Sequence, residues 1–380
     1  MLSYSKRVIL FLIPLFLVAL PFIFQYFLFK VSGENSFEFD KPQEKSKLLV
    51  GYKYDNYKDR YYKYQIISSR KFDIIGIGSS RVLQFRKEFF KKSFYTWNII
   101  NYSQDYLSVL QTLKAHNNLP GFILLQLDER TFNKDFDRNT TTLADLKYPS
   151  TINLDISLTK DVLQDYFALE HKPYFREYIL EGLAAQYYFS GYREDGSYQY
   201  GKLLYTINNQ RRLFDSTFQA TQKNINSGNT FFNIKFSQAS LNNLNDFLDS
   251  CTKENIHVIC FFQPYPSSVL SKLKETGFYP AIADVHNKVE SLLETKTNNH
   301  LYINCDKLSI DDDLNLDGIH PNEWSNVNLL LSIPQGSIFR EILNEDFLQS
   351  RTFASKACLN PGELSAIRDF FDSTKNYFKR

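Results

Sequence analysis

Residues Ile74–Ser80 read Ile-Ile-Gly-Ile-Gly-Ser-Ser. The apolar, β-branched first half predicts a short buried strand, and Gly78-Ser79-Ser80 predicts a sharp turn at its end. The next stretch, Arg81–Lys92, carries apolar residues at helical spacing, namely Val82, Phe85 and Phe89. We therefore expect a strand, a turn and a helix. This arrangement would present a serine hydroxyl at a sheet edge, close to the N–H groups and the positive dipole of a helix N-terminus.

A second polar stretch lies far downstream and reads Leu316-Asp317-Gly318-Ile319-His320-Pro321-Asn322. It places a carboxylate and an imidazole close together in a loop. A serine hydroxyl is a weak nucleophile at neutral pH, so it needs a base within hydrogen-bond reach, and the base needs an orienting acid. We therefore predict Ser80 as the nucleophile, His320 as the base and Asp317 as the orienting acid of a hydrolase or acyltransferase.

Two alternatives stay open for the serines. Ser79 could replace Ser80 as the nucleophile, and either serine could simply be the N-cap of the following helix, a position that serine prefers. The other histidines lack an acidic neighbour in a loop, and we interpret them as ordinary surface residues: His116, His171, His257, His286 and His300.

The composition favours one large folded unit. The chain has 380 residues, of which 43% are hydrophobic and 16% aromatic, enough for a large core or a core with a sizeable insertion. The formal net charge is only +2, and no basic arm or stripe is present. We therefore expect no nucleic-acid partner.

The cysteines and acidic residues do not indicate a metal or a cofactor. The four cysteines, Cys251, Cys260, Cys305 and Cys358, form no C-x-x-C pair. One or two disulfides would suit an exported domain, whereas buried free thiols are the alternative for Cys260 and Cys305. The run Asp311-Asp312-Asp313 reads as a solvated loop rather than a calcium site.

The N-terminus predicts a membrane anchor. Residues 1–7 carry Lys6 and Arg7, residues 8–29 contain no charge, and acidic residues follow. This length spans a bilayer, and the positive-inside rule places the N-terminus in the cytoplasm and the remaining domain outside it. A cleaved signal peptide is the alternative. We favour the uncleaved anchor, because the apolar core is long and offers no good small-x-small cleavage site.

Beyond the anchor, residues 30–70 read as a polar stalk and lead-in, and residues 71–380 as an α/β domain. Apolar strands alternate with helices, which indicates a mainly parallel sheet covered on both faces, in a three-layer α/β/α arrangement. The expected strands are Phe72–Ile77, Tyr95–Ile100, Phe122–Leu127, Val258–Phe262 and Leu301–Asn304. The expected helices include Tyr106–Leu113, a helix around Leu241–Leu248, Ile282–Leu293 and Glu323–Leu331. A final amphipathic helix is expected over Ser365–Arg380.

Residues 133–236 interrupt this rhythm. We expect an insertion or cap, mixed but largely helical, with Asp161–Tyr188 mostly helical and a turn at Arg193–Ser197. Its tyrosines could line a glycan cleft or serve as ordinary core and rim residues. They are Tyr187, Tyr188, Tyr192, Tyr198 and Tyr200.

The two polar stretches resemble the sequence blocks of the SGNH (GDSL-like) hydrolase family. Gly78-Ser79-Ser80 is similar to its Gly-Asp-Ser block, with serine in the middle place, and Asp317-Gly318-Ile319-His320 matches its Asp-x-x-His block in full. The resemblance covers about residues 72–331 apart from the insertion. It implies an SGNH/flavodoxin-like fold and the Ser-His-Asp triad named above.

The resemblance is weaker at the oxyanion hole. The family uses a glycine after the second strand and an asparagine after the third, to support the serine N–H. Here the second strand is followed by Asn101 and Ser103, whose N–H groups are candidate substitutes, and Gln126 or Asp128 stands at the asparagine position. An ionised Asp128 would repel an oxyanion, so we expect it to pair with Arg81 or Arg130.

The resemblance and the anchor together imply an exported serine esterase or O-acyltransferase acting on acyl esters of cell-surface glycans. The layout is similar to that of bacterial proteins that move acyl groups onto cell-surface polymers, which commonly work with a membrane-bound O-acyltransferase. The partners implied are therefore the bilayer, an acylated glycan or acyl donor, and such an enzyme. The alternative is a catalytically degenerate module that binds glycan or scaffolds the membrane enzyme.

Overall fold

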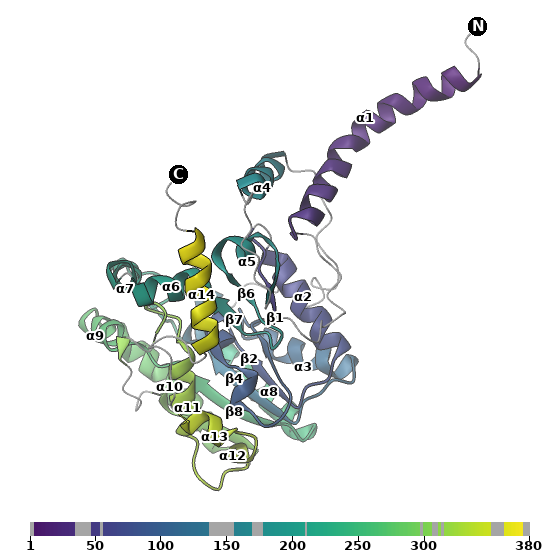
Figure 1. Ribbon diagram of the computed structural model, residues 1–380. Coiled ribbons are helices and arrows are strands. Elements are labelled where there is room, and N and C mark those ends of the chain that lie inside the picture. The colour runs from purple at the N-terminus through teal and green to yellow at the C-terminus, as the bar shows by residue number, and fades with distance from the viewer. Residues whose placement is uncertain are drawn as a thin grey trace.

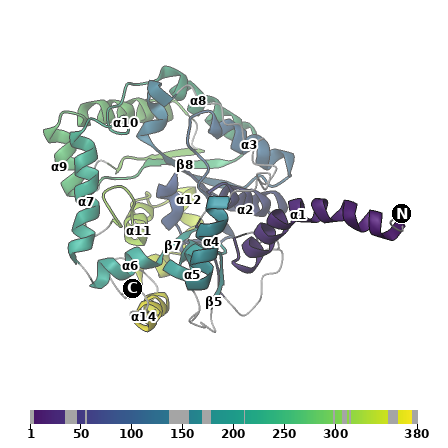
Figure 2. The same cartoon turned by 90° about the horizontal axis from the view of Figure 1, so that it is seen from above.

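The computed structural model describes residues 4–34, 47–53, 56–136, 156–168, 178–209, 211–296, 299–305, 311–312, 315–350 and 361–374. An N-terminal helix, α1 (Tyr4–Val31), projects away from the folded body (Figures 1 and 2). Its segment Phe11–Val31 is long and apolar enough to cross a membrane. By length and composition alone, this agrees with the predicted anchor.

The main sheet has five parallel strands in the order β3-β2-β4-β8-β9. These are β2 (Ile74–Ile77), β3 (Phe94–Trp97), β4 (Phe122–Leu127), β8 (His257–Phe262) and β9 (His300–Ile303). Renumbered in chain order, the strands lie 2-1-3-4-5, a doubly wound order in which ligands bind at the carboxyl ends of the strands where the order reverses. The expected parallel α/β sheet is confirmed.

Apolar residues cover both faces of this sheet. One face packs against α2 (Asn56–Ser69), α3 (Asp105–Ala115), α8 (Gln238–Lys253), α9 (Ser267–Glu275) and α10 (Tyr279–Glu294). The other face packs against α11 (Glu323–Leu331), α12 (Ile338–Glu341) and α13 (Glu345–Gln349). Every residue of β2, β3 and β4 is buried, as expected for parallel strands that are covered on both faces.

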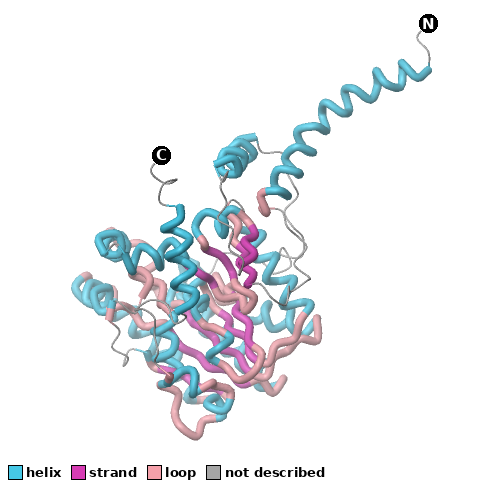
Figure 3. Tube along the Cα trace, viewed as in Figure 1, coloured by secondary structure: helices cyan, strands magenta, loops and turns pink. Residues whose placement is uncertain are grey.

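A second, four-stranded sheet lies above the main one in the view of Figure 3. Its order is β5-β1-β6-β7, with bounds β1 (Lys47–Val50), β5 (Tyr178–Glu181), β6 (Ser190–Tyr192) and β7 (Tyr198–Tyr200). Helices α5 (Leu183–Tyr188), α6 (Gly201–Asn209), α7 (Arg211–Asn226) and α14 (Pro361–Thr374) belong to the same region. The turn expected at Arg193–Ser197 joins β6 to β7.

The lead-in contributes to the fold. Strand β1 pairs in parallel with β5, and α2 packs against the main sheet. The helix agrees with the expected lead-in, whereas the strand was not expected in the stalk. The region 133–236 therefore does not form its sheet alone, because β5 and β6 pair with β1, which lies before this region in the chain. Within Asp161–Tyr188, the described residues of α4 (Ile156–Ala168) and α5 are helical as expected, and the strand β5 before α5 is the exception.

The helix expected over Arg81–Lys92 is absent. The chain forms two short 3-10 turns there, η1 (Ser80–Gln84) and η2 (Lys87–Phe89). Val82, Phe85 and Phe89 all pack into the core below the sheet, so their spacing reflects burial of an irregular segment rather than a helix. Two further 3-10 turns, η3 (Glu129–Phe132) and η4 (Lys134–Phe136), follow β4.

The cysteines of the described residues are buried, at Cys251, Cys260 and Cys305. Cys358 lies outside the described residues, as does Phe378 of the expected C-terminal helix. That helix, α14, buries Phe370 and Phe371 against the second sheet.

Candidate active site

Ser80 lies at the carboxyl end of β2 and is exposed at the start of η1. Its Oγ is 2.9 Å from Nε2 of His320, 240 residues away in the chain. Ser79 has different surroundings, because it is buried and both its N–H and its Oγ donate to Oε1 of Gln126 at 3.0 Å. Ser79 is also the cap of η1. Ser80 is therefore the serine whose hydroxyl is accessible and contacts the His320 imidazole. Ser79 has a structural role, because its hydroxyl donates to Gln126.

Asp317 and His320 are held together by a tight turn. Asp317 Oδ1 accepts the backbone N–H groups of Ile319 and His320, both at 2.7 Å, and its Oδ2 lies 2.9 Å from His320 Nδ1. A Cβ at Gly318 would come within 2.5 Å of the Thr221 side chain, so the turn requires glycine where it packs against α7. The three-residue spacing thus brings the Asp317 carboxylate to the His320 ring, and the other nitrogen of this ring contacts Ser80.

The electrostatics suit a base that accepts a proton at Nε2. Burial raises the pKa of Asp317, but hydrogen bonds from the His320 ring and from two backbone N–H groups outweigh it, so the pKa lies below its ordinary value of 3.8. Because an ionised carboxylate can only accept, Nδ1 of His320 carries a proton and Nε2 is free to accept one from Ser80.

A buried ion pair supports the turn that carries Ser80. Arg81 is 1% exposed, and its Nη1 donates to Glu129 Oε2 at 3.0 Å, which joins the loops after β2 and β4. His286 Nε2 lies 3.2 Å from the other oxygen of Glu129. Burial raises the pKa of Glu129, but Arg81 and His286 outweigh it and lower the pKa. His286 is therefore a buried member of this network, not the surface residue that we expected.

The hydrogen bond and the ion pair that the Asp128 carboxylate forms among the described residues both join it to Arg130. Its Oδ1 accepts the backbone N–H of Arg130 at 3.1 Å and caps η3, while Oδ2 lies 3.7 Å from Arg130 Nη2. Of the two expected partners, Arg130 is the one in direct contact. Arg81 instead pairs with Glu129.

Two of the expected oxyanion donors, the Asn101 N–H and the Gln126 side chain, are engaged in other hydrogen bonds. The Asn101 N–H donates to Asp105 Oδ2 at 2.8 Å, which fixes the start of α3. Ser103 is buried, and its hydroxyl donates to Ser240 on α8. Gln126 accepts from Ser79 through Oε1 and donates to the Leu127 carbonyl through Nε2. These residues position the loops around Ser80, and the Asn101 N–H is directed at Asp105.

Asn98, which the sequence analysis did not single out, lies beside Ser80 in the same pocket. Its Oδ1 accepts a hydrogen bond of 2.7 Å from Nζ of the buried Lys63. Lys63 also donates to the carbonyls of Thr96 and Gly196, which fixes its position. An amide whose oxygen is held in this way directs its Nδ2 donors away from Lys63. The signal available in the sequence was its place as the first polar residue after β3.

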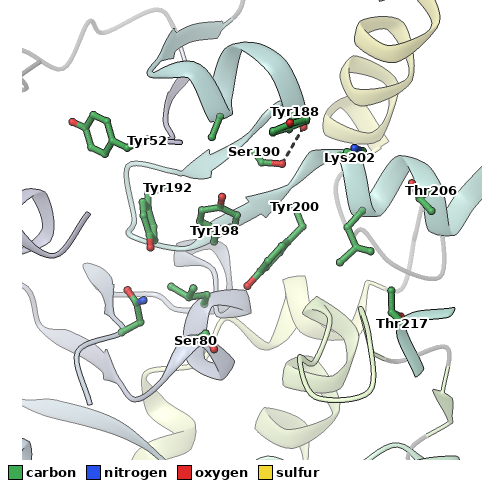
Figure 4. A pocket seen from close by; sticks show the side chains of 14 residues that line it. Tyr52, Ser80, Tyr188, Ser190, Tyr192, Tyr198, Tyr200, Lys202, Thr206 and Thr217 are labelled. Atoms are coloured by element: carbon green, nitrogen blue, oxygen red, sulfur yellow. Dashed lines mark hydrogen bonds between the residues drawn. The ribbon is translucent and has the colours of Figure 1, made fainter. Parts of the chain in front are cut away.

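The pocket around Ser80 has a volume of about 740 Å³ and lies between the two sheets. Tyrosines from the second sheet, from α5 and from the segment after β1 form much of its wall (Figure 4). They are Tyr52, Tyr188, Tyr192, Tyr198 and Tyr200. The Tyr200 ring centre is 6.2 Å from that of His320, so this wall reaches the triad. Tyr187 is not among the lining residues, and its hydroxyl donates to the Asp165 carbonyl on α4.

Within the described parts of the chain, no group of three or more His, Cys, Asp or Glu side chains could hold a metal ion. In the run Asp311–Asp313, Asp312 accepts the Ser268 N–H at 3.0 Å at the start of α9, and Asp313 lies outside the described residues.

No family model, curated protein or solved structure compared with the chain matches it.

Proposed function

We propose that the protein is a membrane-anchored serine esterase or O-acyltransferase that acts on acyl esters of cell-surface glycans. The observation that carries this proposal is the continuous chain from Ser80 Oγ to His320 Nε2 and from His320 Nδ1 to Asp317 Oδ2, with both distances at 2.9 Å. It is the arrangement that converts a serine hydroxyl into a nucleophile. The accessible position of Ser80 at the mouth of a pocket supports the same conclusion.

In the first half-reaction, Ser80 Oγ attacks the ester carbonyl carbon while His320 Nε2 takes the hydroxyl proton. The carbonyl oxygen becomes an oxyanion, for which we assign the Ser80 N–H at the start of η1 and the amide of Asn98, which lines the same pocket, as candidate donors. As the carbon–oxygen bond of the ester breaks, His320 returns the proton to the leaving alcohol. Asp317 stabilises the imidazolium in between, and an acyl group remains on Ser80.

In the second half-reaction, His320 removes a proton from an acceptor hydroxyl that attacks the acyl-serine, and Ser80 regains its proton when it leaves. With water as the acceptor the protein is an esterase. With a sugar hydroxyl it is an O-acyltransferase.

The pocket wall supports a glycan as the substrate. Tyrosine rings offer flat apolar faces together with hydroxyl groups, a combination that suits the apolar faces and polar rims of sugar rings. Burial, Tyr198 and Asp317 raise the pKa of Tyr200, so its hydroxyl stays protonated and can donate near the triad. The cleft formed by β6, β7 and α5 would thus hold the sugar beside Ser80.

The resemblance to SGNH hydrolases belongs to the same proposal. The carboxyl-end position of Ser80, the doubly wound strand order and the two covered sheet faces are compatible with a three-layer SGNH-type domain. We further propose that α1 anchors this domain with the N-terminus in the cytoplasm and the site outside, where a membrane-bound O-acyltransferase could supply the acyl group.

Hydrolysis of an aryl acetate by the purified full chain tests this proposal. We expect release of the phenol by wild type and loss of it in both Ser80→Ala and His320→Ala. Adding acetylated and unacetylated glycan then reports whether the acetyl group passes to water or to a sugar. A folded wild type that neither hydrolyses the ester nor transfers its acetyl group would overturn the enzymatic proposal.

One observation favours a second function. Because Asn101 and Gln126 are engaged in structural hydrogen bonds, fewer oxyanion donors surround Ser80 than the family pattern supplies. Loss of one such donor costs about 100- to 1000-fold in rate. A non-catalytic module would bind glycan in the tyrosine-lined pocket, so glycan binding without any turnover in the same preparations would select it.

A further inference from the structure

Helix α4 carries an unusual concentration of exposed apolar side chains. Outside α1, the described residues include three large hydrophobic side chains that are markedly exposed: Ile156 at 77%, Phe167 at 61% and Ile338 at 37%. Two of these are on α4, a helix of 13 residues. Exposed apolar residues gathered on one element of a soluble surface indicate a contact with lipid or protein.

The two residues lie on the same face of α4. They are eleven positions apart in the chain, about three helical turns at 3.6 residues per turn. Ser157 and Asp161, both exposed, point to a different side of the helix. Helix α4 is therefore amphipathic, with an apolar face that the folded domain leaves open.

The position of α4 beside α1 indicates what covers this face. Val162 is fully buried against Leu28 and Phe29 of α1, and Thr159 Oγ1 donates to Gln25 Oε1 at 2.9 Å. These α1 residues belong to the apolar segment Phe11–Val31. At 1.5 Å per residue, Gln25 lies about 9 Å inside the end of that segment. This is the depth at which an interfacial helix buries its apolar face, roughly 5–10 Å below the headgroups.

We propose that α4 is a second membrane contact of the protein, an interfacial helix whose Ile156 and Phe167 side chains enter the lipid surface next to the anchor. The inference rests on α1 spanning the bilayer, and it does not depend on the chemistry at Ser80. Lys160 is exposed beside the apolar face and can extend its amine to the lipid headgroups.

This contact would also set the position of the pocket. The Tyr187 hydroxyl of α5 donates to the Asp165 carbonyl of α4 at 2.6 Å, and the next residue, Tyr188, lines the pocket. Figure 1 shows α4 above α5 and beside the lower part of α1. A membrane-bound α4 would therefore hold the pocket wall close to the bilayer surface, where a substrate attached to the membrane can reach it.

The test uses the full chain in lipid nanodiscs, with single cysteines labelled by an environment-sensitive fluorophore. Cys358 is replaced by serine, and the three buried thiols stay unlabelled. The probe positions are Ile156→Cys and Phe167→Cys, and the matched control is Asp161→Cys on the polar side of the same helix. Val18→Cys, which is 68% exposed on α1, reports whether the anchor is in the bilayer.

Lipids that carry a nitroxide quencher near the headgroup should quench the labels at 156 and 167 several-fold more strongly than the label at 161. Equal quenching at the three α4 positions would overturn the proposal, whether the label at 18 is quenched or not. Labels at 156 and 167 that are shielded only when a partner protein is added would likewise overturn it, and would assign the face to a protein instead of lipid.

Discussion

Ser79 and Ser80 are chemically identical neighbours, and the fold gives them opposite tasks. The buried hydroxyl of Ser79 donates to Gln126 and holds the turn to β4, whereas the exposed hydroxyl of Ser80 meets His320. A Cβ at Gly78 would come within 2.8 Å of Gln126, so this close approach of the turn to β4 needs glycine. Of the two serine hydroxyls in this turn, only that of Ser80 is exposed and contacts His320.

Asp317→Asn should leave the fold intact and remove most of the activity. The amide can donate to Nδ1 and so favours the wrong tautomer of His320, which costs about 10⁴-fold in a serine triad. The measurement is kcat/KM for an aryl acetate, with Asp311→Asn, an exposed residue outside the triad, as the control. A loss no larger than that of the control would contradict the role given to Asp317.

Asn98→Ala should lower kcat by about 100- to 1000-fold with a smaller effect on KM, because an oxyanion donor acts mainly in the transition state. Asn101→Ala is the matched control, since its side chain donates only to the Ile99 carbonyl at 3.3 Å. Both variants are compared by steady-state kinetics on the same ester. An Asn98→Ala enzyme with the kcat of Asn101→Ala would exclude Asn98 as a donor.

The Asp317–His320 pair could be predicted from the sequence because its hydrogen bonds form within one short turn. Its contact with Ser80 joins residues far apart in the chain and was expected from the two sequence blocks together. The partners of Arg81 and Asn98 could not be predicted. Arg81 binds Glu129 across two loops, and Asn98 binds Lys63 from a helix that precedes the whole sheet. Such pairs depend on the tertiary fold and leave no pattern along the chain.

At the scale of elements, a buried charge cluster ties the two halves of the site together. Arg86 follows η1 and contacts Glu323, the first residue of α11, at 2.5 Å and Glu363 of α14 at 3.2 Å. Arg193 and Asp195, in the turn between β6 and β7, complete the cluster. The segment after Ser80, the helix after His320 and the hairpin of the pocket wall are thereby held by the same charges.

Glu363→Gln should destabilise the protein by about 3–5 kcal/mol, because it leaves Arg193 and Arg86 buried with fewer compensating charges. Urea unfolding of the full chain in detergent, followed through the fluorescence of the fully buried Trp97, gives the free energy. Asp369→Asn, at an exposed position of the same helix, is the control and should change little. Equal stability of the two variants would show that the cluster does not hold α14 in place.

The sequence predicted the elements unevenly. Phe122–Leu127 and Glu323–Leu331 have the expected bounds, because an apolar run with polar flanks, or a capped amphipathic stretch, is decided locally. The second sheet was not predicted, because its strands have only three or four residues and β1 pairs with β5 from far along the chain. In Arg81–Lys92, the buried residues Val82, Phe85 and Phe89 have the spacing of a helix although the segment forms short 3-10 turns.

For the whole molecule, several buried carboxylates should make stability fall in acid. For Glu363 and Asp195, burial acts to raise the pKa, but the neighbouring arginines outweigh it and lower the pKa below the ordinary values of 4.5 and 3.8. A carboxylate with a lowered folded-state pKa stabilises the protein above its unfolded-state pKa. This contribution is lost as the pH falls through the folded-state value.

Urea unfolding across a pH series should therefore give a free energy of unfolding that falls as the pH drops below about 5. The Glu363→Gln variant, which lacks one of these carboxylates, should fall less steeply. A free energy that increases as the pH drops through this window would contradict the charged state given to the cluster.

At the same scale, the site is formed by parts of the chain that meet only in the folded protein: the turn after β2, the loop before α11 and the hairpin of the second sheet. The central claim is that this assembly activates Ser80 and no other serine. The most direct measurement is labelling of the full chain with a fluorophosphonate, followed by mass-spectrometric location of the adduct in wild type, Ser79→Ala and Ser80→Ala. We predict an adduct on Ser80 in wild type and in Ser79→Ala, and none in Ser80→Ala; an adduct on another residue, or none in folded wild type, would contradict the account.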